Sequence, residues 1–169
     1  MRLVNAVVTT IIMMLFFIHM IWGGLELAGV ISGGSKLFLI LSCLLIAFII
    51  IHMIISLKFT ADTIKACRIS KVSYFKENRI FWLRRISGVA LMLFIIIHVL
   101  IFLGKNANGV YLLNVFNAAA LISQLLMVVS LLVHLISNIT PLRIAFGIVD
   151  KKDFKTDLIL VFSILYQKL

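Results

Sequence analysis

Four long stretches of the sequence carry no Lys, Arg, Asp or Glu. They run from Leu3 to Leu25, from Leu37 to Leu57, from Ile86 to Gly104 and from Asn106 to Leu142. Each can supply the roughly 20 apolar residues that a helix needs to cross about 30 Å of hydrocarbon. Only helices and closed barrels satisfy their backbone groups in lipid, and these runs lack the alternation of barrel strands. The sequence therefore predicts an all-α integral membrane protein with a four-helix transmembrane bundle and no strands.

The same pattern predicts the helix boundaries. We expect spanning helices at about residues 3–25, 37–57, 85–104 and 117–138 of one domain that covers residues 1–169. The last of these ends early in its run because Asn138-Ile-Thr-Pro141 is typical of a helix stop. A shorter apolar segment, Leu158 to Gln167, predicts a fifth C-terminal helix at about 156–168. Such a helix would cover only about 15 Å, so it would cross the membrane partially, lie on its surface or lean on a partner chain.

The charges are sorted by position along the chain, with 16 Lys and Arg against 6 Asp and Glu. Basic residues gather between the second and third predicted helices and after the fourth: Lys58, Lys65, Arg68, Lys71, Lys76, Arg79, Arg84, Arg85, Arg143, Lys151, Lys152 and Lys155. The other two connections hold only Lys36 and Lys105. The positive-inside rule therefore predicts a protein of the cytoplasmic membrane with the 58–85 loop and both ends of the four-helix core in the cytoplasm.

This basic balance does not indicate nucleic-acid binding. A nucleic-acid surface needs basic residues interleaved with aromatic ones on a soluble face, and the basic residues here flank apolar spans instead. Some of them are expected to hold the headgroups of membrane lipids.

Each predicted spanning helix contains one histidine, and the chain has no other: they are His19, His52, His98 and His134. An ionisable residue at membrane depth indicates a functional site. The first and third helices run outward and the second and fourth run inward, and every histidine lies past the midpoint of its helix. His19 and His98 are therefore expected in the outer half of the membrane, and His52 and His134 in the inner half. At about 1.5 Å per residue the two pairs are about 14 Å apart along the membrane normal.

Two imidazoles at one depth can bind the two faces of a planar macrocycle, so this arrangement predicts one six-coordinate haem for each pair. Each neutral ring would bind iron through one nitrogen and hold its orientation through a hydrogen bond of the other. A bis-histidine haem has no open position for oxygen or substrate. The pattern therefore favours electron transfer across the membrane.

Small or hydroxyl-bearing residues stand ten or eleven positions before each histidine. They are Thr9, Ser42, Ser87 with Gly88, and Ser123 with Gln124. One interpretation is that these residues leave room for a haem. A helix that binds one haem passes the other about 14 Å away, or about ten residues along, and a bulky side chain there would obstruct the macrocycle. The alternative is ordinary packing, since small residues are enriched where membrane helices touch.

Charged residues near the ends of the spans are candidates for two further roles. Haem propionates need cations, and of the basic residues at the inner end we prefer Arg85 and Arg143, although either could serve only topology and snorkel. Glu26 lies two helical turns beyond His19 on nearly the same face and could exchange protons with a quinone. The alternative for Glu26 is a helix-end carboxylate in water near Lys36.

The stretch Arg84-Arg-Ile-Ser-Gly-Val-Ala-Leu-Met-Leu-Phe-Ile-Ile-Ile-His98 resembles a signature of a known family. It is similar to the Arg-x-Ser/Thr-Gly…His pattern of the cytochrome b membrane anchors of succinate dehydrogenases and fumarate reductases. One histidine in each of four helices, followed by a short fifth helix, resembles the single-subunit class with two haems b.

The resemblance implies that His19 and His98 bind the distal haem and that His52 and His134 bind the proximal one. It also implies a flavoprotein subunit and an iron–sulfur subunit on the cytoplasmic face, docked on the basic 58–85 loop and the end of the fourth helix. Such a chain is not catalytic alone towards the dicarboxylate but reacts with menaquinone or another membrane quinone. This sequence departs from the family in its compact length, its short last helix and the lack of an acid between Leu158 and Gln167.

Two other function classes remain open on the sequence. One is a haem b quinone-linked subunit of another respiratory dehydrogenase, such as a hydrogenase or a formate or nitrate enzyme; those anchors usually concentrate their ligands on fewer helices. The other is a haem-free transporter or structural anchor with the histidines in a proton relay. Relays usually recruit intramembrane Asp or Glu, and none of the four predicted spans has one in its centre.

Overall fold

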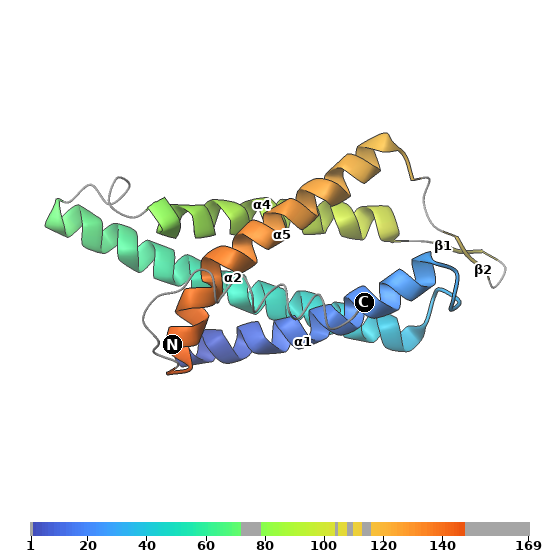
Figure 1. Ribbon diagram of the computed structural model, residues 1–169, viewed down its shortest axis with the longest axis horizontal. Helices are drawn as coiled ribbons and strands as arrows, with labels where there is room; N and C mark the ends of the chain where they lie inside the picture. Colours follow the sequence, from blue (N-terminus) through green and yellow to red (C-terminus); the bar gives the residue numbers. More distant parts are fainter. Residues whose placement is uncertain (1, 72–78, 104, 108–109, 113–115, 148–169) are drawn as a thin grey trace. The chain divides into compact units, whose positions relative to one another are not determined.

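The computed structural model describes residues 2–71, 79–103, 105–107, 110–112 and 116–147. Within them lie four helices, α1 (Arg2–Leu27), α2 (Lys36–Ser70), α4 (Arg79–Phe102) and α5 (Ala118–Ala145), and two strands, β1 (Lys105–Ala107) and β2 (Val110–Leu112) (Figure 1). All four helices are long and apolar enough to cross a membrane, which confirms that prediction. The predicted fifth helix at about 156–168 lies outside the described residues.

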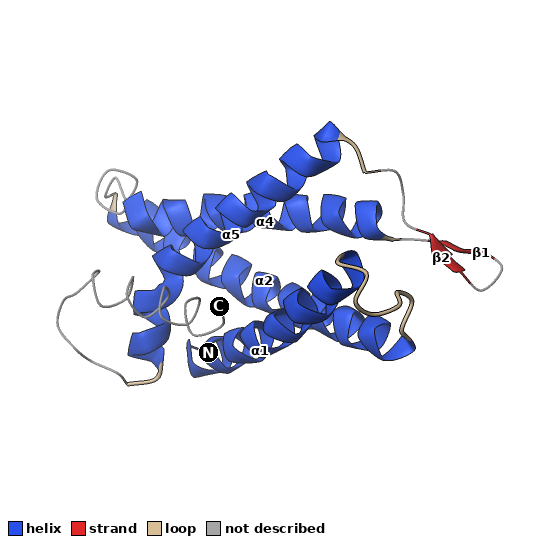
Figure 2. Cartoon of the chain, turned by 45° about the vertical axis from the view of Figure 1, so that its right-hand side comes forward, coloured by secondary structure: helices blue, strands red, loops and turns tan. Residues whose placement is uncertain are grey.

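The helices pack as two antiparallel pairs, each within its own compact unit. In the first helix pair α1 runs alongside α2, and in the second helix pair α5 crosses α4 (Figures 1 and 2). Each pair consists of helices that follow one another in the sequence, and antiparallel packing is the expected arrangement for such neighbours.

Helix α2 continues well past residue 57, where the sequence analysis ended it. The stretch from Lys58 to Ser70 contains neither glycine nor proline, so nothing in it stops a helix. The helix ends where Lys71 takes the left-handed conformation at φ 54°. At 35 residues it is about 52 Å long, longer than a hydrocarbon layer of about 30 Å. Much of the predicted 58–85 loop is therefore helical, as an extension of α2 and as the first turns of α4.

Helix α5 also runs further than expected, through Pro141 to Ala145. Proline has no backbone N–H, so the carbonyl of Ser137, four residues earlier, loses its helical donor. The Nε atom of Arg84 on α4 donates a hydrogen bond to that carbonyl instead. The Ser137 carbonyl therefore keeps a hydrogen-bond donor despite the proline. The helix end predicted at Asn138 to Pro141 does not occur.

Strands β1 and β2 form a small antiparallel hairpin between α4 and α5 in the sequence (Figure 2). Their register pairs Lys105 with Leu112 and Ala107 with Val110. The sequence analysis expected no strand here. The sequence between the two strands is Asn108-Gly109, and Asn-Gly is the dipeptide most favoured in two-residue hairpin loops. This dipeptide was the sequence feature that could have predicted the hairpin.

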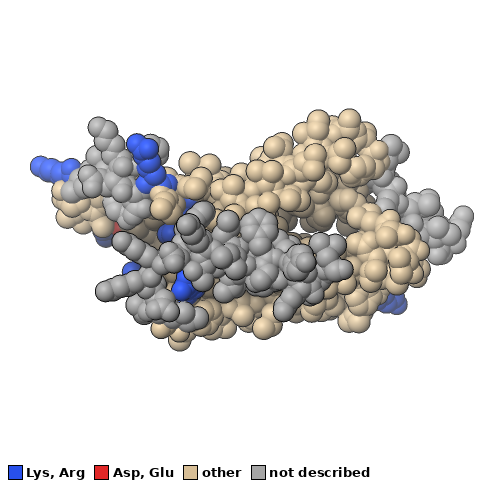
Figure 3. Space-filling model, in the orientation of Figure 1, with Lys and Arg blue, Asp and Glu red and all other residues tan. Residues whose placement is uncertain are grey.

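The described residues bury few apolar side chains within the chain itself. The hydrophobic residues that are buried are Ala6, Val8, Leu45 and Ala120. Large apolar side chains instead are exposed along all four helices. Figure 3 shows that the described residues on one face carry few charged side chains over most of their length. Water-soluble monomers rarely expose apolar patches beyond a few hundred Å². This surface suits contact with lipid.

Candidate functional site

In the first helix pair each histidine faces a hydroxyl on the neighbouring helix. His52 Nδ1 lies 3.3 Å from Thr9 Oγ1, and His19 Nδ1 lies 3.1 Å from Ser42 Oγ. All four side chains are half-buried. The two contacts lie at opposite ends of the pair, because α1 and α2 are antiparallel and each helix carries its hydroxyl about 15 Å before its histidine.

The second helix pair repeats the arrangement with different residues. His134 Nδ1 lies 3.3 Å from Ser87 Oγ, and His98 Nδ1 lies 2.7 Å from Gln124 Oε1. Ser87 is buried, and the other three side chains are half-buried. As in the first pair, the two contacts lie at opposite ends. The structure therefore holds four imidazole rings, each against one polar residue of the adjacent helix.

A common register explains all four contacts. The histidine follows its polar residue by ten positions from Thr9 to His19 and from Ser42 to His52. In the second helix pair the spacings are eleven positions on α4, from Ser87 to His98, and ten on α5, from Gln124 to His134. When two antiparallel helices have a similar spacing from polar residue to histidine, a contact between the polar residue of one and the histidine of the other brings the remaining two residues together as well. These polar positions are visible in the sequence, where haem clearance and packing were the interpretations, but their contact with the histidines of the neighbouring helix was missed. The nearly equal spacing on adjacent antiparallel helices was the signal that could have revealed it.

The backbone hydrogen bonds of the hydroxyls favour one tautomer for three of the four rings. Each hydroxyl donates its single hydrogen to a backbone carbonyl about one turn earlier: Thr9 to Asn5 at 2.8 Å, Ser42 to Phe38 at 2.8 Å, and Ser87 to Arg84 at 3.2 Å. Towards the imidazole the hydroxyl oxygen can then only accept. These contacts favour Nδ1 as the donor in His52, His19 and His134, which in a neutral ring leaves the lone pair on Nε2.

The same reasoning applies to His98 through two residues. Ser123 Oγ donates to the Ala120 carbonyl at 2.7 Å, so its oxygen accepts from Gln124 Nε2 at 3.3 Å. This contact turns the Gln124 carbonyl oxygen towards His98, whose Nδ1 must donate. Ser123, a predicted cofactor-contact residue, thus lies against Gln124 rather than against a histidine.

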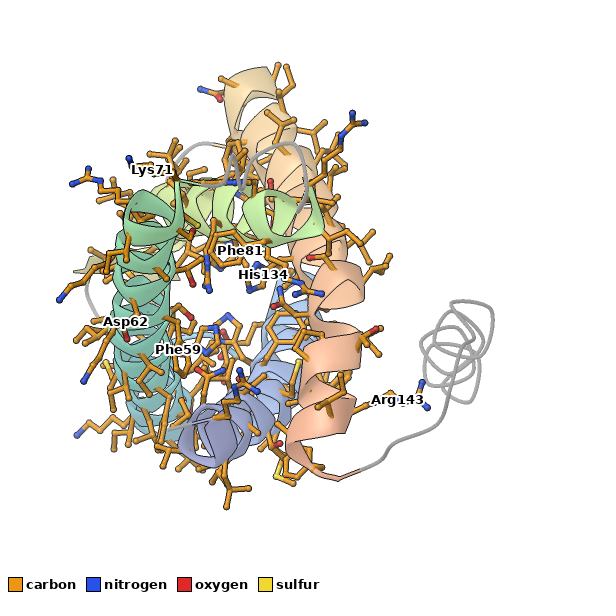
Figure 4. All side chains as sticks on the ribbon, turned by 90° about the vertical axis from the view of Figure 1, so that its left-hand side faces the viewer. Phe59, Asp62, Lys71, Phe81, His134 and Arg143 are labelled. Carbon is orange, nitrogen blue, oxygen red and sulfur yellow. The ribbon has the colours of Figure 1, made fainter. Side chains whose placement is uncertain are left out.

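Gly88 is where α4 comes closest to a histidine of α5. A Cβ atom at Gly88 would lie 3.1 Å from His134 Cε1 and 3.4 Å from its Nδ1. Figure 4 shows His134 on the side of α5 that faces α4. The absent side chain therefore makes room for the imidazole, which places Gly88 and Ser87 together on one ring.

Arg84 and Arg85 are adjacent in the sequence but differ in their contacts. Arg84 is committed to the Ser137 carbonyl. The Arg85 guanidinium lies over the Phe81 ring, 4.9 Å from its centroid, and its buried Nε makes no hydrogen bond to the described residues. Arg143 lies in the last turn of α5, where Figure 4 shows it extending away from His134. Arg85 is thus the better placed of the two predicted propionate partners.

Glu26 is connected to His19 through stacked rings. Its Oε1 accepts a hydrogen bond of 3.2 Å from Trp22 Nε1. The Trp22 and Phe38 rings stack at 5.8 Å, and Phe38 stacks on His19 at 5.1 Å. Sequence reasoning proposed Glu26 but missed Trp22 and Phe38, one on each helix of the pair. Aromatic residues one turn from a histidine and from its hydroxyl partner were the available signal.

The Nδ1 contacts of the four histidines are of the kind that supports a haem-ligating histidine. In the part of the chain that the structure describes, no three His, Cys, Asp or Glu side chains form a group that could hold a metal ion. A haem needs two axial ligands, and in each ring here Nδ1 lies within hydrogen-bonding distance of a polar side chain, the usual support for a ligating histidine. The unpartnered Arg85 Nε also suits an acidic group from outside the described residues.

The predicted ligand pairs, His19 with His98 and His52 with His134, each join a residue of the first helix pair to one of the second. They stay a prediction. Comparisons of the chain with protein-family models, with curated proteins and with solved structures found no match.

Proposed function

We propose that this protein carries electrons across the membrane through two bis-histidine b haems. One observation carries the proposal: all four intramembrane histidines have Nδ1 within hydrogen-bonding distance of a polar side chain on the neighbouring helix, three times a hydroxyl and once a carboxamide, and the hydrogen bonds of these partners favour Nδ1 as the donor. A cluster of histidines that served packing or proton relay alone would not need the same tautomer at every ring. Ligation through Nε2 does.

We keep the ligand pairs predicted from the depth of the histidines along their spans. His19 and His52 are at opposite ends of the first helix pair, and His98 and His134 are at opposite ends of the second. Ligands about 15 Å apart along a helix cannot bind the two faces of one macrocycle, which supports one ligand from each helix pair for each proposed haem. The depth of the residues selects His19 with His98 as the outer, distal set and His52 with His134 as the inner, proximal set.

The remaining site residues would support these ligands. Once bound, a bis-histidine haem takes up and releases one electron at a time. The hydroxyls of Thr9, Ser42 and Ser87 hold three imidazoles in orientation, and Gly88 lets His134 approach α4. Arg85 would pair with a propionate of the inner haem, because its Nε is buried and an anion satisfies it.

The wider assignment rests on the family resemblance of Arg84 to His98. We propose that the chain is the membrane anchor of a succinate:quinone oxidoreductase or a quinol:fumarate reductase in the cytoplasmic membrane. The basic end of α2 and the following residues would dock an iron–sulfur subunit, with a flavoprotein subunit beyond it, on the cytoplasmic face. Glu26, which is bonded to Trp22 beside His19, would exchange protons with menaquinone or another quinone near the outer haem.

A reduced-minus-oxidised visible spectrum of the purified full chain tests the haem proposal. We expect a b-type α band and two haems per chain. Thr63→Ala serves as the matched control, because Thr63 back-bonds only to Phe59 on the extended end of α2 and should leave the haem content unchanged. A helical, monodisperse preparation without the α band would overturn the proposal.

Co-purification from membranes tests the partner assignment separately. A complex containing covalent or tightly bound flavin and iron–sulfur clusters, active in succinate-dependent quinone reduction or quinol-dependent fumarate reduction, would support it. Recovery of haem with a hydrogenase or a formate or nitrate enzyme would overturn the dicarboxylate assignment and leave the electron-transfer role intact.

A further inference from the structure

One of the four histidine contacts differs from the others in chemistry and in length. His19, His52 and His134 contact hydroxyl oxygens at 3.1 to 3.3 Å, whereas His98 contacts a carboxamide oxygen at 2.7 Å. A carboxamide oxygen is the stronger acceptor, because its C=O dipole places more negative charge on it. The shorter distance agrees with a stronger bond.

The carboxamide cannot turn freely to present its nitrogen instead. Gln124 Nε2 donates to Ser123 Oγ, and Ser123 Oγ has committed its own hydrogen to the Ala120 carbonyl. Rotation of the amide would place two donors against each other at His98 and would leave Ser123 without its donor. Ser123 therefore fixes the orientation of Gln124, and Gln124 fixes the acceptor at His98.

We infer that Gln124, oriented by Ser123, is a positioning residue that lowers the reduction potential of the haem bound by His98. The inference rests on the proposed haem function and adds a residue that sets one of its properties. A strong hydrogen bond from Nδ1–H makes the imidazole more basic at Nε2. A more basic axial ligand stabilises the ferric ion over the ferrous ion, so the potential falls. In a half-buried, low-dielectric position the bond is stronger than it would be in water.

Redox titration of the full-length, haem-loaded protein tests the inference with three variants. Gln124→Leu removes the acceptor and should raise the midpoint of one of the two haem transitions while leaving the other in place. Gln124→Glu supplies a stronger acceptor and should lower the same midpoint. Ser123→Ala keeps the carboxamide but frees its orientation, so the same midpoint should rise by a smaller amount.

Two further variants act as matched controls. Ser87→Ala removes the hydroxyl that contacts His134 Nδ1 and should move the other transition. Ser130→Ala, a serine of α5 between Gln124 and His134, should move neither. Should Gln124→Leu lose haem, Ser123→Ala still supplies the measurement, because it leaves every ligand and the carboxamide in place.

The outcomes separate this inference from the proposed function. Wild-type protein without a b-type band would overturn both. A wild type that binds haem, with Gln124→Leu and Ser123→Ala fully loaded and both midpoints unmoved or moved equally, would overturn only the role of Gln124. Movement of one midpoint in opposite directions in Gln124→Leu and Gln124→Glu supports it.

Discussion

The two helix pairs have the same arrangement of histidines but different residues around them. Each is an antiparallel pair with a histidine and a polar partner at either end. In the first helix pair the partners are two hydroxyls, and an aromatic stack of Trp22 and Phe38 lies against His19. In the second, a glycine meets His134, a carboxamide meets His98, and an arginine satisfies the carbonyl exposed by Pro141.

This comparison distinguishes the position of each imidazole from the chemistry of the contacts around it. The shared register sets where the imidazoles lie and which nitrogen they present. The contacts around each ring set how tightly it is held and how basic it is. Substitutions that change the register or remove a ligand should therefore act alike in the two pairs. Substitutions around a ring should have effects peculiar to that pair.

Removal of ligands should have the largest effect. His98→Ala should abolish the outer haem and leave the inner one at least partly loaded, because the two haems share no ligand. The double variant His19→Ala/His98→Ala should lose no more haem than His98→Ala alone. The double variant His19→Ala/His52→Ala should lose both haems. Haem-to-protein ratios from the visible spectrum measure all three.

The opposite ranking would contradict ligation between the two helix pairs. If His19→Ala/His98→Ala were haem-free while His19→Ala/His52→Ala kept one haem, each haem would belong to a single helix pair. A folded His98→Ala protein that has lost both haems would argue against independent sites.

Enlarging Gly88 should have the next largest effect. A Cβ at Gly88 lies 3.1 Å from His134, so Gly88→Ala requires a shift of a few tenths of an ångström and Gly88→Val requires displacement of the imidazole. We expect partial loss of one haem with alanine and near-complete loss with valine, measured as haem-to-protein ratio.

Gly24 of the first helix pair is the matched control for this prediction. An added Cβ there meets nothing within 4 Å, and its backbone is helical like that of Gly88. Gly24→Val should keep both haems. Equal losses in Gly88→Val and Gly24→Val would mean that helix propensity, not contact with His134, controls the effect.

The link between Arg84 and Pro141 should have a smaller effect, on stability rather than on haem content. Arg84→Ala leaves the Ser137 carbonyl without a donor, which costs about 1–3 kcal/mol when the group is buried. Pro141→Ala restores a backbone N–H, so Arg84→Ala should cost clearly less in that background. Unfolding of the purified variants in mixed detergent measures the cycle. Additive costs would show that Arg84 does not replace the missing donor.

The helices themselves were largely predictable from the sequence. Uncharged runs of spanning length determine four helices because lipid leaves the backbone few alternatives. The ends of α2 and α5 were not found, for two different reasons. Basic residues after Lys58 were interpreted as a loop, although charge alone does not stop a helix. The effect of Pro141 depends on Arg84, a residue 57 positions earlier in the sequence.

The positions of the four histidines in the spans were predictable from the sequence and their surroundings less so, while their role as haem ligands stays a prediction. An isolated histidine in each span is a strong signal, because imidazole in hydrocarbon requires a partner. Contacts such as Thr9 with His52 depend on the register between two helices, and the sequence analysis treated each helix alone. The tautomers required one further step, the back-bonds of the hydroxyls, which follow only when backbone and side-chain positions are both known.

The smallest expected effect concerns how the second helix of each pair begins. Ser35 caps α2 by accepting from the Phe38 N–H at 3.4 Å, and Asn117 caps α5 by accepting from the Ala120 N–H at 2.9 Å. Replacing such a cap with alanine costs about 0.5–2 kcal/mol. The shorter bond at Asn117 should place Asn117→Ala higher in this range than Ser35→Ala, measured by the same detergent unfolding.

Glycine variants show whether the difference in cost between Asn117→Ala and Ser35→Ala comes from the capping hydrogen bond or from the backbone conformation at the cap. A glycine cap costs only a few tenths of a kcal/mol relative to the polar residue, because it adopts the capping conformation readily and leaves the first N–H groups open to water. Ser35→Gly and Asn117→Gly should therefore both be nearly neutral. If Ser35→Ala destabilised the protein more than Asn117→Ala, the stability contributed by the two caps would not follow their hydrogen-bond lengths. The two pairs would then differ around their histidines but not in how their helices begin.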